Sequence, residues 1–250
     1  MPPEATQYEF PIFRTEILER DGVCHGFFGR PRPPLDGDRD AALRACAYHL
    51  GIPPEGLYIL RQVHGDHVHI IRKKEDVTAP GAPPRADIAI TDKRGVYLCI
   101  RTADCVPILF LDPERRAVAA AHAGWRGTVL NVAGRAIRAM NELFGSRPRD
   151  ICAALGPAVG PCCYEVDEPV AGPLLRADPE GRRFLHPARK GHWMLDLQAL
   201  NVHQIVQAGV REKNVRQIPA CTACRTDLFY SRRAEGGIRG EQISLIGLNP

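Results

Sequence analysis

A cysteine and a histidine lie on either side of a short turn near the middle of the chain, where together they could bind a metal ion. The segment TADCVPILFLDPERRAVAAAHAGWRG contains Cys105 and His122. Its Asp112–Arg115 stretch is typical of a type I turn, and apolar runs of strand length flank it. A hairpin symmetric about this turn places Cys105 directly opposite His122, with β-carbons about 5 Å apart. A one-residue bulge would break this pairing, and a buried thiol beside a buried imidazole is the plainer interpretation.

Three histidines in QVHGDHVHI offer a further ligand. His67 and His69 would share one face of a strand, whereas His64 precedes a Gly-Asp turn. One cysteine and two histidines would form a three-ligand zinc site that keeps a fourth position open for a reactant. Hydrogen bonding at the surface or in the core is the other explanation for these histidines, and their spacing alone does not choose among them.

Other groups of reactive residues carry weaker signals. Cys162-Cys163 and Cys221–Cys224 suggest a second metal site, but adjacent cysteines chelate poorly, so thiols that line a pocket or the core are favoured. Cys46 and Cys99 lie in apolar segments and are expected to be core residues. Three arginines among glycines near the C-terminus indicate either an anion site or a solvated loop, of which we favour the loop: Arg232, Arg233 and Arg239.

Several common catalytic motifs are absent from the sequence. It contains no phosphate-binding P-loop, no dinucleotide-binding GxGxxG, no GxSxG nucleophile elbow and no HExxH zinc motif. No histidine is followed two positions later by glutamate, so the usual signature of zinc nucleobase deaminases is missing as well. A zinc enzyme with this sequence must therefore use another arrangement of ligands.

The composition is typical of a globular protein with a substantial core. The 250 residues are 44% hydrophobic and 25% charged, with a formal net charge of +4. The dispersed arginines and few aromatic residues argue against nucleic acid as a partner. No apolar stretch approaches the roughly 18 residues of a membrane span, so we expect no membrane partner. The N-terminal MPPEATQYEF lacks secretory features, and an odd number of cysteines, nine, suggests free thiols, so we expect a cytoplasmic protein.

Hydrophobic periodicity predicts more strands than helices. One helix follows Thr128 as its N-cap and ends at Gly145. A second spans about Asp40–Leu50, and a third follows Asp196 and ends at Gly209. This mixture indicates a single mixed α/β domain rather than an alternating parallel fold. The predicted strands are Tyr58–Val63, Val68–Ile71, Asp87–Thr91, Val96–Arg101, Val106–Leu111, Ala117–Ala121, Ile151–Leu155 and Ile243–Leu248.

Five motifs, in order along the chain, resemble one protein family. They are QVHG at 62–65, RTADCVPILFLD at 101–112, HAGWRG at 122–127, LGPAVGPCCYEV at 155–166 and the C-terminal CT…DLFYSRR. From about Gly22 onward the sequence is similar to the YfiH-type proteins, which have been called the multicopper polyphenol oxidase (laccase) domain family. Members of that family are now understood as purine nucleoside phosphorylases that also deaminate adenosine.

The resemblance implies an α+β fold, with a mixed two-sheet core flanked by helices in α-β-β-α layers. Residues 1–250 would form one domain, of which residues 1–21 are the least similar part. The implied metal ligands and catalytic residues are His64, Cys105 and His122, so the resemblance selects His64 among the three candidate histidines. Zinc is the expected cofactor and copper is the alternative. Arg44 and Arg61 are the expected substrate-binding residues, because guanidinium groups would hold a phosphate.

The implied function is zinc-dependent purine nucleoside phosphorylase activity combined with adenosine deaminase activity. Purine nucleosides and phosphate would be the partners, and adenosine, inosine, guanosine or methylthioadenosine would yield free base and ribose-1-phosphate. One alternative is a copper-dependent polyphenol oxidase, for which the chain offers few clustered histidines. Another is a hydrolase that edits peptidoglycan precursors, and a third is a metal-binding protein without catalysis.

Overall fold

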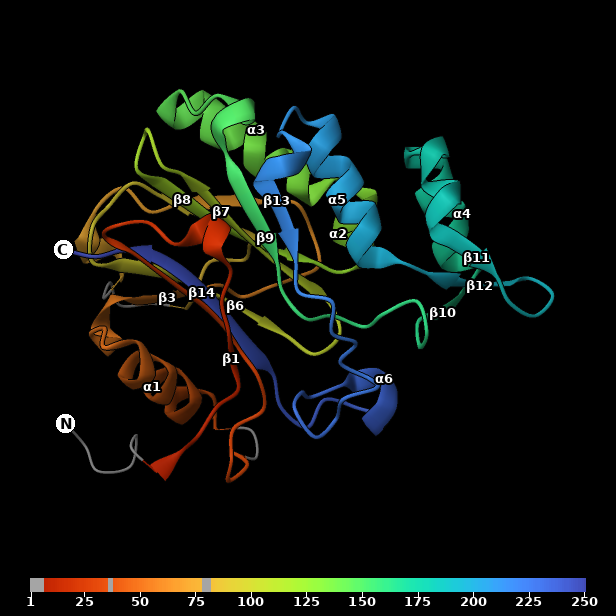
Figure 1. The fold of residues 1–250 in the computed structure, drawn as a ribbon, viewed down its shortest axis with the longest axis horizontal. Coiled ribbons are helices and arrows are strands. Elements are labelled where there is room, and N and C mark those ends of the chain that lie inside the picture. The colour runs from red at the N-terminus through yellow and green to blue at the C-terminus, as the bar shows by residue number, and fades with distance from the viewer. Residues whose placement is uncertain (1–6, 36–37, 78–81) are drawn as a thin grey trace.

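Two β-sheets pack face to face in the computed structural model, which describes residues 7–35, 38–77 and 82–250 (Figure 1). The first six residues of the N-terminal segment considered above as a possible secretory signal lie outside the described residues. The first sheet combines strands from both ends and the middle of the chain. Its order within the described residues is β1 (Ile12–Phe13), β2 (Val23–Phe28), β14 (Gln242–Leu248), β6 (Val96–Thr102) and β3 (Leu57–Ile59).

The second sheet carries the segments expected to bind the metal. Side chains such as Leu109 and Val118 from this sheet pack against Leu98 and Ile246 of the first, forming the core between the layers. Its central strands are buried along their whole length, which explains their continuous apolar sequence. In order, the described strands are β13 (Val215–Gln217), β9 (Cys152–Leu155), β7 (Val106–Asp112), β8 (Ala117–Ala123), β5 (Ile88–Thr91) and β4 (Val68–Ile70).

Helices cover the outer faces of both sheets. Helix α1 (Arg39–Leu50) packs Leu43 and Cys46 against Leu245 of the first sheet. On the other side, the second sheet is covered by α3 (Val132–Phe144) and α5 (Leu197–Gln207) (Figure 1). The predicted α-β-β-α layering is therefore confirmed. Cys46 and Cys99 are both buried core residues, as the sequence predicts.

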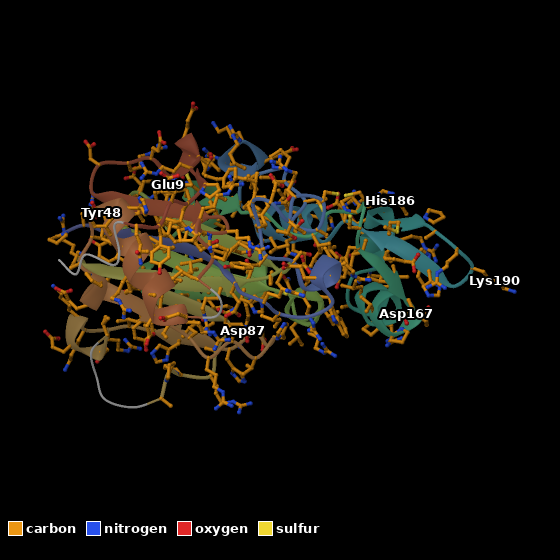
Figure 2. The ribbon with its side chains drawn as sticks, turned by 90° about the horizontal axis from the view of Figure 1, so that it is seen from below. Glu9, Tyr48, Asp87, Asp167, His186 and Lys190 are labelled. Carbon is orange, nitrogen blue, oxygen red and sulfur yellow. The ribbon has the colours of Figure 1, made fainter. Side chains whose placement is uncertain are left out.

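A smaller, three-stranded sheet extends from one end of the body. It consists of β10 (Glu165–Asp167), β12 (His192–Leu195) and β11 (Leu185–Pro187), accompanied by α4 (Glu168–Ala177). In Figure 2, Asp167, His186 and Lys190 lie in this projection, whereas Asp87 lies in the main body. No helix in the described part of the chain has both the length and the apolar character needed to cross a membrane. The remaining helices are α2 (Trp125–Val129), α6 (Arg232–Glu235) and 3-10 turns at Glu16–Leu18, Pro54–Gly56, Lys74–Val77, Pro148–Asp150, Pro179–Phe184 and Glu212–Asn214.

The predicted register of the β7–β8 hairpin is wrong by two residues. His122 pairs with Pro107 rather than Cys105, and Asp112 pairs with Ala117. The loop is longer because the Asp112 carboxylate accepts hydrogen bonds from two following backbone N–H groups, after which Arg116 adopts a positive φ of 50°. Because a shift of two preserves the side-chain alternation, His122 stays on the expected face. Cys105 lies just before β7 and reaches that face from the loop.

The predicted helix start at Thr128 is also wrong, whereas the other two helices are confirmed within about two residues. Thr128 lies inside α2, where its hydroxyl donates to the Gly124 carbonyl. Asn131 is the true N-cap of α3, since its side chain accepts a hydrogen bond from the Gly134 N–H at 3.0 Å. The chain thus breaks between two helices where the sequence pattern predicts one, and the predicted end at Gly145 is correct.

Candidate metal centre and its cavity

Three side chains from separate segments converge at one end of the second sheet. The ligand atoms of His64, Cys105 and His122 all lie within 4.8 Å of one another. The Cys105 Sγ is 3.9 Å from Nε2 of His64, and the two imidazole rings are 4.7 Å apart at their centroids. His64 precedes β4, Cys105 precedes β7 and His122 is in β8. The fold therefore brings together the three predicted ligands.

Asp87, directly before β5, organises two of these ligands through a fully buried carboxylate. Its oxygens accept hydrogen bonds from the backbone N–H groups of Val63, His64 and Gly65, at distances from 2.7 to 3.2 Å. They also accept the Nδ1–H of His122 at 2.8 Å. These bonds hold the loop in which His64 has a φ of 61°, and they leave Nε2 of His122 free to bind a metal. Asp87 was not recognised as a functional residue from the sequence. An acidic residue next to an apolar strand segment was the signal that could have indicated its role.

Gly124 allows the ligands to approach each other closely. A β-carbon at this position would lie 2.8 Å from Cδ2 of His64 and 3.0 Å from Sγ of Cys105. Contacts this short would displace one of the two side chains. Steric crowding therefore explains why glycine occupies this position of the HAGWRG motif.

The electrostatics of the centre favour a cysteine thiolate. Burial opposes ionisation of Cys105, but the imidazoles of His122 and His64 lower its pKa to about 6. Burial also opposes protonation of His122, but Asp87 and Cys105 raise its pKa to about 9. Asp87 itself resists ionisation through burial, yet the hydrogen bonds from His122 and the backbone lower its pKa. A thiolate therefore faces an imidazolium near neutral pH, and a metal ion bound by these side chains would take the place of that proton.

This donor set fits zinc. One thiolate and two imidazole nitrogens are ligands that zinc accepts, and a carboxylate hydrogen-bonded to a ligating histidine is the usual support of such a site. Three protein ligands leave the fourth position of a tetrahedral ion for a reactant. The same donors can also bind copper, so the geometry alone does not identify the metal.

A cavity of about 420 Å³ opens next to this centre. Besides His64 and Cys105, its lining includes Trp125, Tyr164 and Arg233. Burial raises the pKa of Tyr164 to about 12, so its hydroxyl stays protonated and can donate a hydrogen bond. The Arg233 guanidinium carbon lies 5.3 Å from the Tyr164 ring centroid. The cavity thus combines flat aromatic surfaces, positive charge and the metal ligands.

Asp104 anchors the C-terminal segment to the loop that carries Cys105. It has a φ of 91°, so the chain there is not a regular strand. Its carboxylate accepts hydrogen bonds from the Thr222 and Ser231 hydroxyls and the Arg233 N–H, each at 2.7 Å. These bonds occupy both oxygens of the carboxylate and tie the C-terminal segment to the loop before β7.

The remaining predicted residues are not among those that line this cavity. Arg44 on α1 and Arg61 before β4 are exposed, and neither is among the residues that line the cavity. His69 stacks on Tyr58 and lies 2.7 Å from its hydroxyl, while His67 is exposed. The described arginines that do line the cavity are Arg126, Arg232 and Arg233. For Arg232 and Arg233 the sequence pattern favours a solvated loop, whereas the structure places them in the cavity wall.

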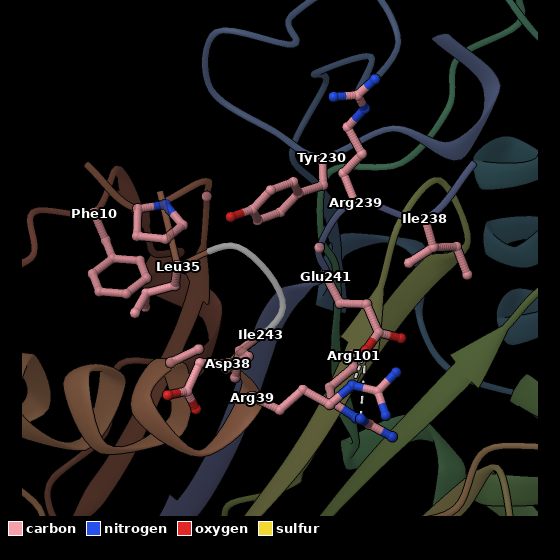
Figure 3. A pocket seen from close by; sticks show the side chains of 14 residues that line it. Phe10, Leu35, Asp38, Arg39, Arg101, Tyr230, Ile238, Arg239, Glu241 and Ile243 are labelled. Atoms are coloured by element: carbon pink, nitrogen blue, oxygen red, sulfur yellow. Dashed lines mark hydrogen bonds and ion pairs between the residues drawn. The ribbon is translucent and has the colours of Figure 1, made fainter. Parts of the chain in front are cut away.

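A second cavity, of about 250 Å³, lies between α1 and the C-terminal segment (Figure 3). Its charged groups are largely paired, since Glu241 contacts Arg39 at 3.1 Å and Arg101 at 3.4 Å. Arg239 lines this cavity and not the one beside the metal centre. Neither of the two possible metal-binding clusters in the described residues is part of its lining.

Comparison with known proteins agrees with this architecture. The chain is 36% identical over 209 residues to "Purine nucleoside phosphorylase YlmD" of Geobacillus stearothermophilus, covering 82% of this chain and 76% of that protein. It is 33% identical to "Purine nucleoside phosphorylase LACC1" of Homo sapiens over 82% of its own length, but it spans only 46% of that longer protein. The crystal structure of the hypothetical protein YfiH of Bacillus licheniformis superimposes with a TM-score of 0.82 at 30% identity, covering 90% of this chain and 92% of that one.

The family assignment rests on a match that covers most of the chain. Residues 38–249 match the family described as "Multi-copper polyphenol oxidoreductase laccase". This range includes the three metal-ligand candidates, Asp87 and every residue that lines the adjacent cavity. The chain therefore belongs to the multi-copper polyphenol oxidoreductase laccase family, the family of YfiH-type proteins.

Proposed function

We propose that this chain is a zinc-dependent purine nucleoside phosphorylase. The observation that carries the proposal is the position of His64, Cys105 and His122, whose ligand atoms converge beside a cavity lined by arginine and aromatic side chains. The names of the two relatives supply the reaction class. A volume of about 420 Å³ lies within the range of small-molecule sites.

The cavity offers complementary groups for both reactants. The flat faces of Trp125 and Tyr164 suit a purine ring. Arg232 and Arg233 suit an inorganic phosphate, because guanidinium groups make paired hydrogen bonds to its oxygens. They are stronger candidates for this role than Arg44 and Arg61, which stay predictions from the family resemblance. Arg126 lies 4.2 Å above the Trp125 ring and extends the positive surface.

In phosphorolysis, a phosphate oxygen forms a bond to C1′ of the ribose while the bond between C1′ and the purine nitrogen breaks. The electron pair of that bond leaves with the purine, which takes up a proton, and ribose-1-phosphate remains. Arg232 and Arg233 would hold the phosphate in place for attack, which removes most of the entropic cost of the encounter. The Tyr164 hydroxyl can donate a hydrogen bond to the purine as negative charge develops on it. A zinc ion, when bound, supplies Lewis-acid polarisation to a reactant group beside it.

Adenosine deamination in the same cavity is the second part of the proposal. In that reaction water adds at C6 of the purine and ammonia leaves, which converts adenosine to inosine. The thiolate of Cys105 and the imidazoles of His64 and His122 would hold a zinc ion, which would supply Lewis-acid activation for that water. Both reactions therefore depend on the same three ligands.

Product analysis tests the proposal. Purified protein should convert adenosine, inosine, guanosine or methylthioadenosine to free base and ribose-1-phosphate only when phosphate is present, and should form inosine from adenosine without it. Cys105→Ala should lower both activities by at least about a hundredfold, because a metal ligand is lost. Cys24→Ala is the matched control, because Cys24 lies on β2 and is not among the residues that line the cavity.

Copper-dependent oxidation is the competing function, since a site with two histidines and one cysteine also binds copper. Protein purified without added metal should contain zinc and should not oxidise phenols. Copper in that protein, phenol oxidation after copper loading and no turnover of any purine nucleoside would together overturn the proposal. Formation of ribose-1-phosphate that survives in Cys105→Ala would refute the assignment of the site.

A further inference from the structure

Four cysteines form a second cluster outside the cavity beside the metal centre. The Sγ atoms of Cys162, Cys163, Cys221 and Cys224 all lie within 4.8 Å of one another. Sγ of Cys224 is 3.5 Å from that of Cys162 and 3.4 Å from that of Cys163. These separations far exceed the roughly 2.05 Å of a disulfide, and all four residues are free thiols. We propose that the four cysteines bind one zinc ion as a structural site, distinct from His64, Cys105 and His122.

The sulfur positions are close to those that zinc requires. With zinc–sulfur bonds of about 2.3 Å, the corners of a tetrahedron lie about 3.8 Å apart. The separations of Cys224 from Cys162 and Cys163 fall a few tenths of an ångström below that value, and all the sulfur atoms lie within 4.8 Å of one another. Small side-chain rotations would therefore complete the coordination. Four cysteine ligands fill every position of the ion, so this site holds structure and leaves no position for a reactant.

The local backbone removes the objection that adjacent cysteines chelate poorly. The Gly160 carbonyl accepts hydrogen bonds from the N–H groups of Cys163 and Tyr164, both at 3.0 Å, which closes a tight turn. In a turn that winds like a helix, successive side chains are separated by about 100° rather than pointing to opposite sides. Cys162 and Cys163 can therefore both face Cys224.

Two loops are already joined at the position that the ion would occupy. Ala158 pairs with Cys221 as a parallel bridge, and the Thr222 N–H donates to the Ala158 carbonyl at 3.0 Å. The Gly160 N–H donates to Sγ of Cys221 at 3.2 Å. A backbone donor to sulfur is favourable when that sulfur is a thiolate, as a zinc ligand must be. These bonds hold one thiol of the loop after β13 against the loop after β9.

The proposed site lies beside residues of the cavity wall. Tyr164, which lines the cavity, directly follows Cys163. Thr222 lies between the two cysteines of the second loop and donates its hydroxyl to Asp104. A zinc ion here would cross-link the two loops and thereby hold Tyr164 and the Asp104 network in position.

Zinc content of the full-length protein tests this inference. The wild-type chain should bind two zinc ions, whereas Cys224→Ser and Cys105→Ala should each bind one and the double variant none. Cys24→Ser should keep both ions. Cobalt bound to Cys105→Ala should give the intense visible absorption of a tetrahedral tetrathiolate complex. Since the Cys105→Ala protein lacks the proposed catalytic centre, this result stands or falls separately from the proposed function.

A measurement on the unsubstituted protein guards against variants that fail to fold. In the wild type, a chelator should expose all four cluster thiols to alkylation without any reductant. Alkylation that requires a reductant would show a disulfide and overturn the inference, as would iron in place of zinc. Equal zinc content in the wild type and in folded Cys224→Ser would overturn it as well.

Discussion

The centre formed by His64, Cys105 and His122 and the four-cysteine cluster show two different ways of preparing a metal site. In the first, a buried carboxylate directly before a sheet strand fixes a loop and an imidazole through four hydrogen-bonded groups. In the second, two surface loops are joined by backbone bonds, and two of the four cysteines are exposed. The first site is therefore preorganised by the core, whereas the second gains much of its order from the ion itself.

Among substitutions of residues that are not themselves ligands, loss of the Asp87 charge should give the largest effect, and it should affect only the preorganised centre. Asp87→Asn cannot accept all the hydrogen bonds that the carboxylate accepts, so the His64 loop and the His122 ring should lose their positions. We expect metal affinity at this centre and nucleoside phosphorolysis to fall about 10- to 100-fold. Metal titration and initial-rate measurements would check this.

The four-cysteine cluster is the internal control for that experiment. Its zinc should remain in Asp87→Asn, because the Asp87 carboxylate binds His122 and the backbone of residues 63–65, all of which belong to the three-ligand centre. Unchanged affinity at the three-ligand centre would contradict the role that we assign to Asp87.

Protons should compete with metal at the three-ligand centre. With Cys105 at a pKa of about 6 and His122 at about 9, the pair retains one proton between these values, mainly on the imidazole. Binding must release that proton, so apparent zinc affinity should rise about tenfold per pH unit from about 6 to 9 and level off above. Competition titrations with a chelator of known pH dependence, on Cys224→Ser protein, would measure the slope. A flat profile from pH 6 to 8 would show that the centre carries no such proton.

Close packing at Gly124 gives a smaller effect. A β-carbon there meets His64 at 2.8 Å and Cys105 at 3.0 Å, so Gly124→Ala should force one ligand from its preferred rotamer. A strain of about 1–1.5 kcal/mol corresponds to roughly a tenfold loss of metal affinity. Gly237→Ala is the control, since a β-carbon at that position meets no atom within 4 Å. Isothermal titration calorimetry of both variants would measure the expected difference in metal affinity. Equal affinities would mean that His64 and Cys105 can move aside without a cost in free energy.

The two sites also differ in how far the sequence could predict them. The layers and most central strands follow from continuous apolar runs, because burial on both faces leaves a clear pattern. The hairpin register depends on two bonds to the Asp112 carboxylate and on a positive φ at Arg116, which no periodicity encodes. Family resemblance, rather than spacing, singled out His64.

The residues that the sequence reasoning missed, or for which it favoured another role, act through contacts between distant segments. Asp87 meets His122 only because β5 and β8 pair, and Arg233 reaches the cavity because Asp104 binds its backbone. The four cysteines converge because β9 and β13 run side by side and lead into adjacent loops (Figure 1). Each of these relations depends on tertiary pairing, which the local sequence pattern does not determine.

The smallest expected effect concerns Gly160, which is the counterpart of Gly124 at the four-cysteine cluster. A β-carbon there would lie 3.2 Å from Cβ of Cys221 and 3.4 Å from Sγ of Cys162, distances that require shifts of only tenths of an ångström. Because the cluster lies on surface loops, its neighbours can move more easily than those around Gly124. We therefore expect Gly160→Ala to speed chelator-driven zinc loss only about threefold, a free-energy change of about 0.7 kcal/mol. Zinc release rates measured on the Cys105→Ala background would isolate this site. A free-energy change as large as the one expected for Gly124→Ala would show that the cluster is as rigid as the three-ligand centre.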